Sequence, residues 1–203
     1  PYDSNYMWDG NTNYFGASVY GHFATALAWS NIFLAVNDLG MSTLMVRDAA
    51  RNRASMPIVF GNTLIVEILF SLLFFGITVL LAAGFHYDNV TFILIMILTA
   101  AGLVYEFRKV MRGIFRVLFQ LKDVVVLEVL MGIATFGGTW FILHNAIKQQ
   151  EALFNLAWLR LILNALFVGG MFIYTLRVVR PHYDVKKIIP MIKESFPFSL
   201  YNF

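Results

Sequence analysis

Long runs of apolar residues with very few charges are the feature that most constrains this 203-residue chain. An α-helix rises about 1.5 Å per residue, so roughly 20 apolar residues cross the hydrocarbon core of a bilayer. Backbone groups in lipid must be hydrogen-bonded within their own segment, so runs without alternation are helices rather than barrel strands. We predict an all-α fold, a polytopic transmembrane helix bundle of about five complete spans plus the start of a sixth. The spans are expected at residues 20–46, 57–85, 90–105, 124–143 and 152–176, and the sixth begins near residue 188.

The composition excludes several other classes of protein. Of the residues, 59% are hydrophobic and 13% are charged, whereas an average soluble chain has about 25% charged residues. Such a chain has too little polar surface for a water-soluble globule and too many apolar residues for a disordered chain or a coiled coil. The net charge of +3 is too small to define a nucleic-acid-binding surface. The absence of cysteine excludes a disulfide scaffold, a thiolate metal site and a catalytic thiol.

The basic residues lie on alternate connectors. Thirteen Lys and Arg residues follow the first, third and fifth spans, whereas the opposite connectors hold only Lys148 and the last cation, Arg160, lies inside the fifth span. Cytoplasmic loops carry such an excess, so we expect the basic connectors in the cytoplasm of a multi-pass protein of the cell membrane. Residues 1–19 are polar, rich in glycine and free of basic residues, and we expect them to form an outward-facing segment ahead of the bundle at residues 20–203.

Four ionisable residues lie inside the apolar runs: Asp38, Glu67, Glu128 and Arg160. Charged groups at membrane depth are costly and usually face a bundle interior or water. For Asp38 and Arg160 we favour a polar lumen over interhelical hydrogen bonds that only hold the bundle together. Glu67 fits either role, and Glu128 is shallow enough to reach headgroup water. An ion pair of Arg160 with Asp38 or Glu67 stays open.

Two of these residues, Asp38 and Arg160, have polar residues at helical spacing beside them. Each set is a candidate helix face for the lining of a substrate pathway. Asn31, Asp38 and Ser42 follow at spacings of 7 and 4 and would share one face of a continuous helix. Arg160 and Asn164 lie four residues apart on one face of the fifth span. Two such faces on separate helices predict a polar lumen between them. The candidates for its lining are Arg160, Asn164, Asp38, Asn31, Ser42 and Glu67.

The connector at residues 106–123 has the pattern of a basic amphipathic helix. Lys109, Arg112 and Arg116 recur at spacings of 3 and 4 on one face, and apolar residues occupy the other. The simpler interpretation is a helix at the cytoplasmic surface whose cations lie over anionic headgroups. The alternative is a basic entrance for a phosphate-bearing lipid, for which Arg47 at the end of the first span is a further candidate.

No catalytic pattern occurs in the sequence. It contains no phosphate loop, no zinc-protease motif, no nucleophile elbow and no paired-carboxylate loop. We therefore expect no enzymatic activity, no cofactor and no metal site.

Three elements of the chain resemble the polysaccharide-biosynthesis flippases of the multidrug/oligosaccharidyl-lipid/polysaccharide exporter superfamily. The first is the stretch 20–51, which contains Tyr20-Gly21-His22-Phe23, Asp38-Leu39-Gly40 and Val46-Arg47-Asp48. The second is Gly113-Ile114-Phe115-Arg116, which is similar to the family's glycine-phenylalanine-arginine element except for the added Ile114. The third is the tail 193–203, which is similar to the start of the family's seventh helix. The order and separation of the three elements match the family along nearly the whole chain after residue 20.

This resemblance implies a function. A flippase of this family moves a lipid-linked oligosaccharide of the polyprenyl diphosphate type to the outer leaflet, for surface polysaccharides such as O-antigen. It works by alternating access around a hydrophilic, often cationic cavity between two lobes in a prokaryotic plasma membrane. The chain would then be helices two to six and the start of the seventh, a fragment without its leading span and carboxyl-terminal lobe. The expected partners are the lipid-linked oligosaccharide, membrane lipids and that missing lobe.

Two other functions stay open. A cation-coupled multidrug antiporter of the same superfamily would use Asp38 and Glu67 as proton or sodium carriers. A membrane-embedded glycan polymerase or ligase would need a large outward-facing loop, and the predicted outward connectors are all short.

Overall fold

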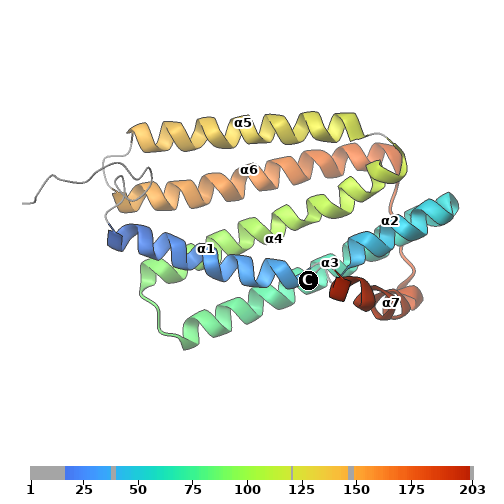
Figure 1. Cartoon of the computed structure of the whole chain (residues 1–203), viewed down its shortest axis with the longest axis horizontal. Helices are drawn as coiled ribbons and strands as arrows, with labels where there is room; N and C mark the ends of the chain where they lie inside the picture. Colours follow the sequence, from blue (N-terminus) through green and yellow to red (C-terminus); the bar gives the residue numbers. More distant parts are fainter. Residues whose placement is uncertain (1–16, 38–39, 120, 146–148, 202–203) are drawn as a thin grey trace, which may run out of the picture.

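The chain forms a bundle of long helices in this computed structural model, which describes residues 17–37, 40–119, 121–145 and 149–201 (Figure 1). All regular structure within these ranges is helical, which confirms the predicted all-α class. The helices are α1 (Ala17–Asn37), α2 (Met41–Arg51), α3 (Met56–Gly84), α4 (Asn89–Val117), α5 (Leu121–Asn145), α6 (Gln149–Val178) and α7 (Ile188–Tyr201). Short 3₁₀ turns at Arg53–Ser55 and Val185–Lys187 precede α3 and α7. Residues 1–16 of the expected outward-facing segment lie outside the described residues.

Four helices in the described part of the chain, α3, α4, α5 and α6, are long and apolar enough to cross a membrane. They coincide with the second to fifth predicted spans, and the structure therefore fits a membrane protein. The predicted count of five complete spans plus a sixth is not confirmed, because neither the first predicted span nor α7 forms such a helix.

The first predicted span consists of two helices rather than one. α1 ends at Asn37, α2 begins at Met41, and Gly40 between them has φ 75° and ψ 6°. This left-handed conformation suits glycine and interrupts a right-handed helix. The prediction that Asn31 and Ser42 share one helix face assumed a continuous helix, and the break at Gly40 removes that basis. Asp38 itself lies outside the described residues.

The helices alternate in direction, so the basic connectors meet at one end of the bundle. We call this end, where α2, α4 and α6 finish and α3, α5 and α7 begin, the basic end (Figure 1). α4 is the central helix. It packs against α1, α2, α3 and α6, and more lightly against α5.

Most of the predicted surface connector is the last part of α4. The helix continues without a break to Val117, and Val110 and Ile114 are fully buried in a cluster with residues of α2 and α3. Gly113 allows this approach, because a Cβ there would collide with the side chain of Met45. The apolar face of the stretch therefore packs onto protein rather than lying on a membrane surface, which corrects the expectation.

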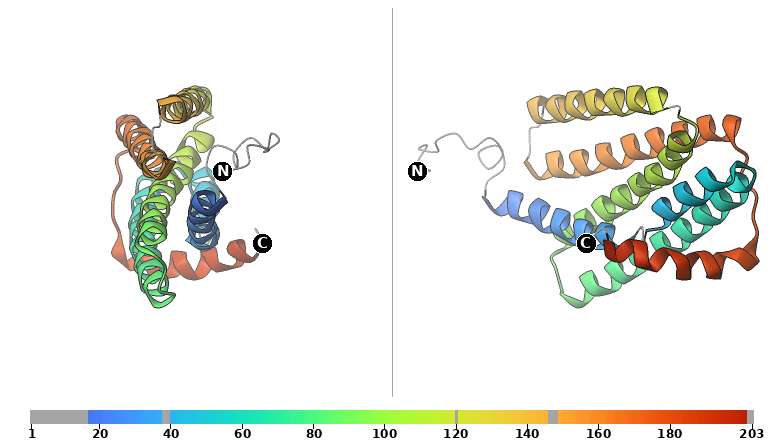
Figure 2. Two further views of the ribbon diagram at one scale, coloured as in Figure 1. Left: turned by 90° about the vertical axis from the view of Figure 1, so that its left-hand side faces the viewer. Right: turned by 45° about the vertical axis from the view of Figure 1, so that its right-hand side comes forward.

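α7 lies across the bundle instead of alongside its helices. It contacts α2 and α3, and Figure 2 shows it crossing the long axis of the bundle. Met191 is buried in the apolar cluster of α2, α3 and α4, and this contact anchors α7 on the bundle. A helix does begin at residue 188 as predicted, but over the described residues it does not run parallel to α3 or α4.

The segment after α6 docks onto the start of α3. The amide of His182 donates to the carbonyl of Pro57 (2.9 Å). The side chain of Asn62 both donates to the carbonyl of Asp184 and accepts from its amide, at 3.0 Å each. Asn62 is completely buried, and these bonds satisfy the amide that burial removes from water.

Candidate functional site

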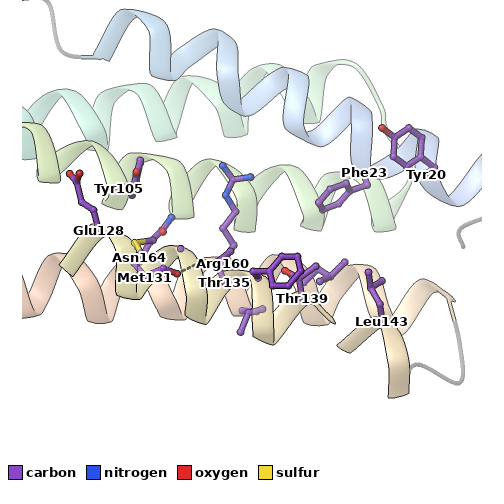
Figure 3. A pocket seen from close by; sticks show the side chains of 14 residues that line it. Tyr20, Phe23, Tyr105, Glu128, Met131, Thr135, Thr139, Leu143, Arg160 and Asn164 are labelled. Carbon is purple, nitrogen blue, oxygen red and sulfur yellow. Dashed lines mark hydrogen bonds between the residues drawn. The ribbon is translucent and has the colours of Figure 1, made fainter. Parts of the chain in front are cut away.

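A cavity of about 680 Å³ lies between α1, α4, α5 and α6 (Figure 3). Half of its lining residues come from one side of α5, and Leu156, Leu159, Arg160 and Asn164 of α6 form a second wall. The α5 residues are Glu128, Met131, Gly132, Thr135, Phe136, Thr139 and Leu143. Three aromatic residues, Tyr20 and Phe23 of α1 and Tyr105 of α4, complete it.

The cavity exists because α5 is attached mainly to α6. Val124 is the buried residue of α5, in a cluster with Met111, Phe115 and Met171 near the basic end. Beyond Val124, several of the residues that face the cavity are small: Gly132, Thr135 and Thr139. Gly132 is the clearest case, since a Cβ at this position would meet no atom within 4 Å.

The length of the cavity along α5 is comparable to the thickness of the hydrocarbon core of a bilayer. Glu128 near the basic end and Leu143 near the other end are fifteen residues apart on α5. This separation is about 22 Å of helix, against roughly 30 Å of hydrocarbon. The lining therefore follows α5 through most of the thickness that such a helix would cross.

Arg160 and Asn164, which the sequence places on one helix face, both line this cavity. Figure 3 shows the side chain of Arg160 reaching from α6 into the cavity. Within the described residues its guanidinium has no hydrogen bond or ion pair, so the pair with Glu67, one of the two alternatives left open by the sequence, does not form. Asn164 is buried and donates to the carbonyl of Ala101 on α4 (2.8 Å), so it also ties α6 to α4.

Glu128 lies at the basic end of the cavity and does not simply face headgroup water. Its Oε1 accepts from Arg108 at 2.9 Å and lies 3.4 Å from Nη1 of Arg112. The ring of Tyr105 lies under the guanidinium of Arg108, with 4.3 Å from Cζ to the ring centroid. Two cations of α4 are thus held against one acid of α5.

The other basic candidates do not form a single entrance. Lys109 pairs with Glu106 one turn earlier on α4. Arg116 is exposed and has no ion pair among the described residues. Of the predicted set on α4, only Arg112 reaches the cavity end, through Glu128.

Arg47 has a different role, at the contact of α2 with α7. Its guanidinium lies 2.7 Å from Asp48 and 3.3 Å from Glu194 of α7. The hydrogen bond to Asp48 raises the pKa of Arg47 above its ordinary value. This ion-pair network lies away from the cavity lining.

The remaining pathway candidates also lie elsewhere. Glu67 is 2% exposed and has a polar partner, and it is not part of the cavity lining. Asn31 is exposed and Ser42 is half-buried with a partner of its own, and neither lines the cavity.

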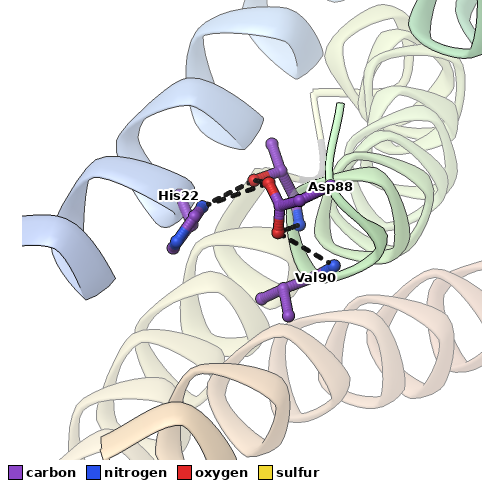
Figure 4. Close-up of polar contacts among 4 residues, drawn as sticks. His22, Asp88 and Val90 are labelled. Carbon is purple, nitrogen blue, oxygen red and sulfur yellow. Dashed lines mark hydrogen bonds and ion pairs between the residues drawn. The ribbon is translucent and has the colours of Figure 1, made fainter. Parts of the chain in front are cut away.

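A polar cluster joins α1 to α4 at the end opposite the basic end (Figure 4). Asp88 caps α4 by accepting from the amides of Val90 and Thr91, and it accepts from the Thr91 hydroxyl at 2.6 Å. These bonds, led by the one from the hydroxyl, lower the pKa of Asp88. Because Thr91 gives its hydroxyl proton to Asp88, Nδ1 of His22 must be the donor in its 2.7 Å contact with Thr91.

Sequence reasoning missed the polar stripe of α5. Glu128, Gly132, Thr135 and Thr139 recur at spacings of 4, 3 and 4, which places them on one helix face. This spacing was available as a signal, but glycine and threonine in an apolar run are as common in helix packing as in a cavity wall.

A comparison of the chain with protein-family models, curated proteins and solved structures found no match.

Proposed function

We propose that the chain is part of a flippase that moves a lipid-linked oligosaccharide across the cell membrane for surface polysaccharide biosynthesis. The observation that carries this proposal is the guanidinium of Arg160, which has no partner in the described residues and reaches into a cavity of about 680 Å³. An arginine inside a membrane span costs about 2.5–3.5 kcal/mol even on insertion scales. Such a cation needs an anionic partner, and the diphosphate head of a polyprenyl-linked sugar would supply one.

The rest of the lining suits an amphiphilic substrate. Tyr20 and Tyr105 each offer an apolar ring face and a hydroxyl, which match the CH faces and hydroxyls of a sugar. Thr139 and Asn164 add small polar contacts, and Leu143, Leu156 and Leu159 supply apolar surface. A purely apolar drug would offer no hydrogen-bond partners to the hydroxyls of Tyr20, Tyr105 and Thr139.

The resemblance in the sequence supports the same function, with the carboxyl-terminal lobe of the flippase as the partner that would close the cavity. The antiporter remains the second candidate, because Asp38, one of its two expected ion carriers, lies outside the described residues. The other carrier, Glu67, is buried away from the cavity, and this favours the flippase.

The test is to delete the gene that encodes this chain and follow the lipid-linked oligosaccharide. The account expects the intermediate to accumulate in the cytoplasmic leaflet while surface polysaccharide falls, and the intact gene to restore both. Normal export together with altered resistance to cationic drugs would support the antiporter instead.

A further inference from the structure

A second cationic position, besides Arg160, lies next to the basic end of the cavity, where Glu128 of the lining meets two arginines. Arg108 and Arg112 of α4 both contact Oε1 of Glu128, at 2.9 and 3.4 Å. We propose that these two arginines form an anion site that Glu128 occupies at rest, and from which the diphosphate of an entering lipid-linked substrate displaces it. This inference rests on the proposed function and adds to it the point of entry.

The charges at this position do not balance. Two guanidinium groups face one carboxylate, so one positive charge is left over. The nearest other acid on α4, Glu106, is paired with Lys109, and Asp123 of α5 accepts from the hydroxyl of Tyr174 (2.6 Å). A diphosphate carries at least two negative charges, and it would therefore neutralise the two arginines better than Glu128 alone does.

The two arginines also have more N–H donors than there are acceptors around them. Nε of Arg108 and Nε of Arg112 are both buried and have no acceptor among the described residues. A guanidinium presents five N–H donors in a planar fork, and one carboxylate oxygen uses only a small part of that capacity. The additional oxygens of a diphosphate could accept from these unused donors, so the site offers more donors than its present occupant can accept from.

The site adjoins the cavity through its neighbours, although neither arginine lines the cavity itself. The side chain of Arg108 is 19% exposed and that of Glu128 is 22% exposed, so both are screened from bulk solvent but not sealed. Glu128 and Tyr105 line the cavity, and the tyrosine ring under Arg108 fixes the guanidinium beside it.

The two cationic positions follow one another along the bundle. Glu128 lies seven residues after the start of α5, which begins at the basic end, whereas Arg160 lies eleven residues after the start of α6, which begins at the opposite end. Arg160 is therefore farther from the basic end than Glu128. An anion that enters from the basic end would meet Arg108 and Arg112 first and Arg160 second.

Binding of geranylgeranyl diphosphate to the chain in phosphatidylcholine nanodiscs tests the exchange. Glu128→Gln should tighten binding by about fivefold, because it removes the competing carboxylate and keeps the shape. The double variant Arg108→Gln/Arg112→Gln should weaken it by about tenfold. Arg116→Gln is the matched control, since it removes an exposed arginine of α4 that contacts no acid in the described part, and it should leave binding unchanged.

Three further arms identify the ligand. Geranylgeraniol, which lacks the phosphates, should bind all variants equally. Inorganic pyrophosphate should bind more weakly than the prenyl diphosphate, and equal binding would mean that the site takes a free anion, which overturns the lipid-linked part of the proposal. If phosphatidylglycerol in the nanodisc abolishes the gain from Glu128→Gln, the arginines bind ordinary headgroups and the proposal is wrong.

The outcomes separate this inference from the proposed function. A purely structural ion pair predicts that Glu128→Gln lowers thermal stability without tightening binding, and that result overturns the exchange. If Arg160→Gln loses binding while Glu128→Gln and the double variant match the wild type, the exchange fails and the flippase stands. If the wild-type chain binds no prenyl diphosphate, both fail.

Discussion

The carbonyl of His182 fills the space that a side chain at position 61 would need. A Cβ on Gly61 would collide with this carbonyl, while the amide of His182 donates to Pro57 one turn earlier on α3. Glycine at this position therefore lets the segment between α6 and α7 lie directly on the α3 backbone. The contact joins two segments that are more than a hundred residues apart in the chain.

Gly61→Ala should lower stability by about 1–3 kcal/mol, the usual cost of overpacking against a backbone that cannot move away. Gly76→Ala is the control, because a Cβ at this position of the same helix meets no atom within 4 Å. It should be neutral or slightly stabilising, since alanine is the better helix former. Thermal unfolding of both variants in the same detergent measures the difference, and equal midpoints would contradict the docking.

The four long helices could be predicted from the sequence, but two helix boundaries could not. α3 to α6 were predictable because each is a long apolar run between polar connectors. The break at Gly40 was not, because glycine also occurs inside helices, and only the backbone reveals φ 75°. The end of α4 was misplaced because cations on one face are typical both of a surface helix and of a helix packed onto protein.

Some residues of the cavity lining could likewise be predicted from the sequence, and others could not. Arg160 and Asn164 were predictable from their depth and four-residue spacing, and both line the cavity. The shallow depth of Glu128 predicts contact with headgroup water. Its ion pairs were not predictable, because the partners lie on another helix, twenty and sixteen residues earlier in the chain. A contact between helices of this kind depends on the packing of α4 beside α5, which one sequence does not specify.

The loss of thermal stability caused by Asp88→Asn should depend on pH. Asp88 lies at the end of the bundle opposite the basic end (Figure 4). The lowered pKa of Asp88 means that folding favours its charged form. This contribution to stability is present above the ordinary pKa of aspartate and is lost as the pH falls below about 4, through the lowered value. The wild type should unfold at a higher temperature than Asp88→Asn at pH 6, and the difference should shrink as the pH falls below the ordinary aspartate value of about 4. A difference that stays constant as the pH is lowered would mean that the charge is not responsible.

Single cysteines test the orientation, because the chain has none of its own. Gln150→Cys, at the start of α6, should react with an impermeant thiol reagent in intact cells. Ala54→Cys, at the basic end before α3, should react only after the membrane is opened. Both positions are exposed, so burial within the protein does not explain protection. The reverse pattern would overturn the cytoplasmic assignment of the basic end.

Gly132→Phe should obstruct the cavity and reduce export severely at normal abundance. A Cβ at Gly132 has open space around it, and this residue lines the cavity. Gly137→Phe is the control on the same helix, with equally open surroundings and a place outside the lining. Surface polysaccharide divided by the amount of membrane-inserted protein is the measurement. Equal export by the two variants would show that the substrate does not use this cavity.

The central claim is that Arg160 receives the anionic head of the substrate, and export by Arg160→Gln tests it most directly. A charge-assisted hydrogen bond contributes about 1.5–3 kcal/mol, so export per protein molecule should fall roughly 10- to 100-fold. Abundance should be unchanged, because no acid among the described residues loses its partner. Arg160→Lys should keep part of the activity, and Arg177→Gln, near the end of the same helix and outside the cavity, should keep all of it. Normal export by Arg160→Gln at normal abundance would contradict the account.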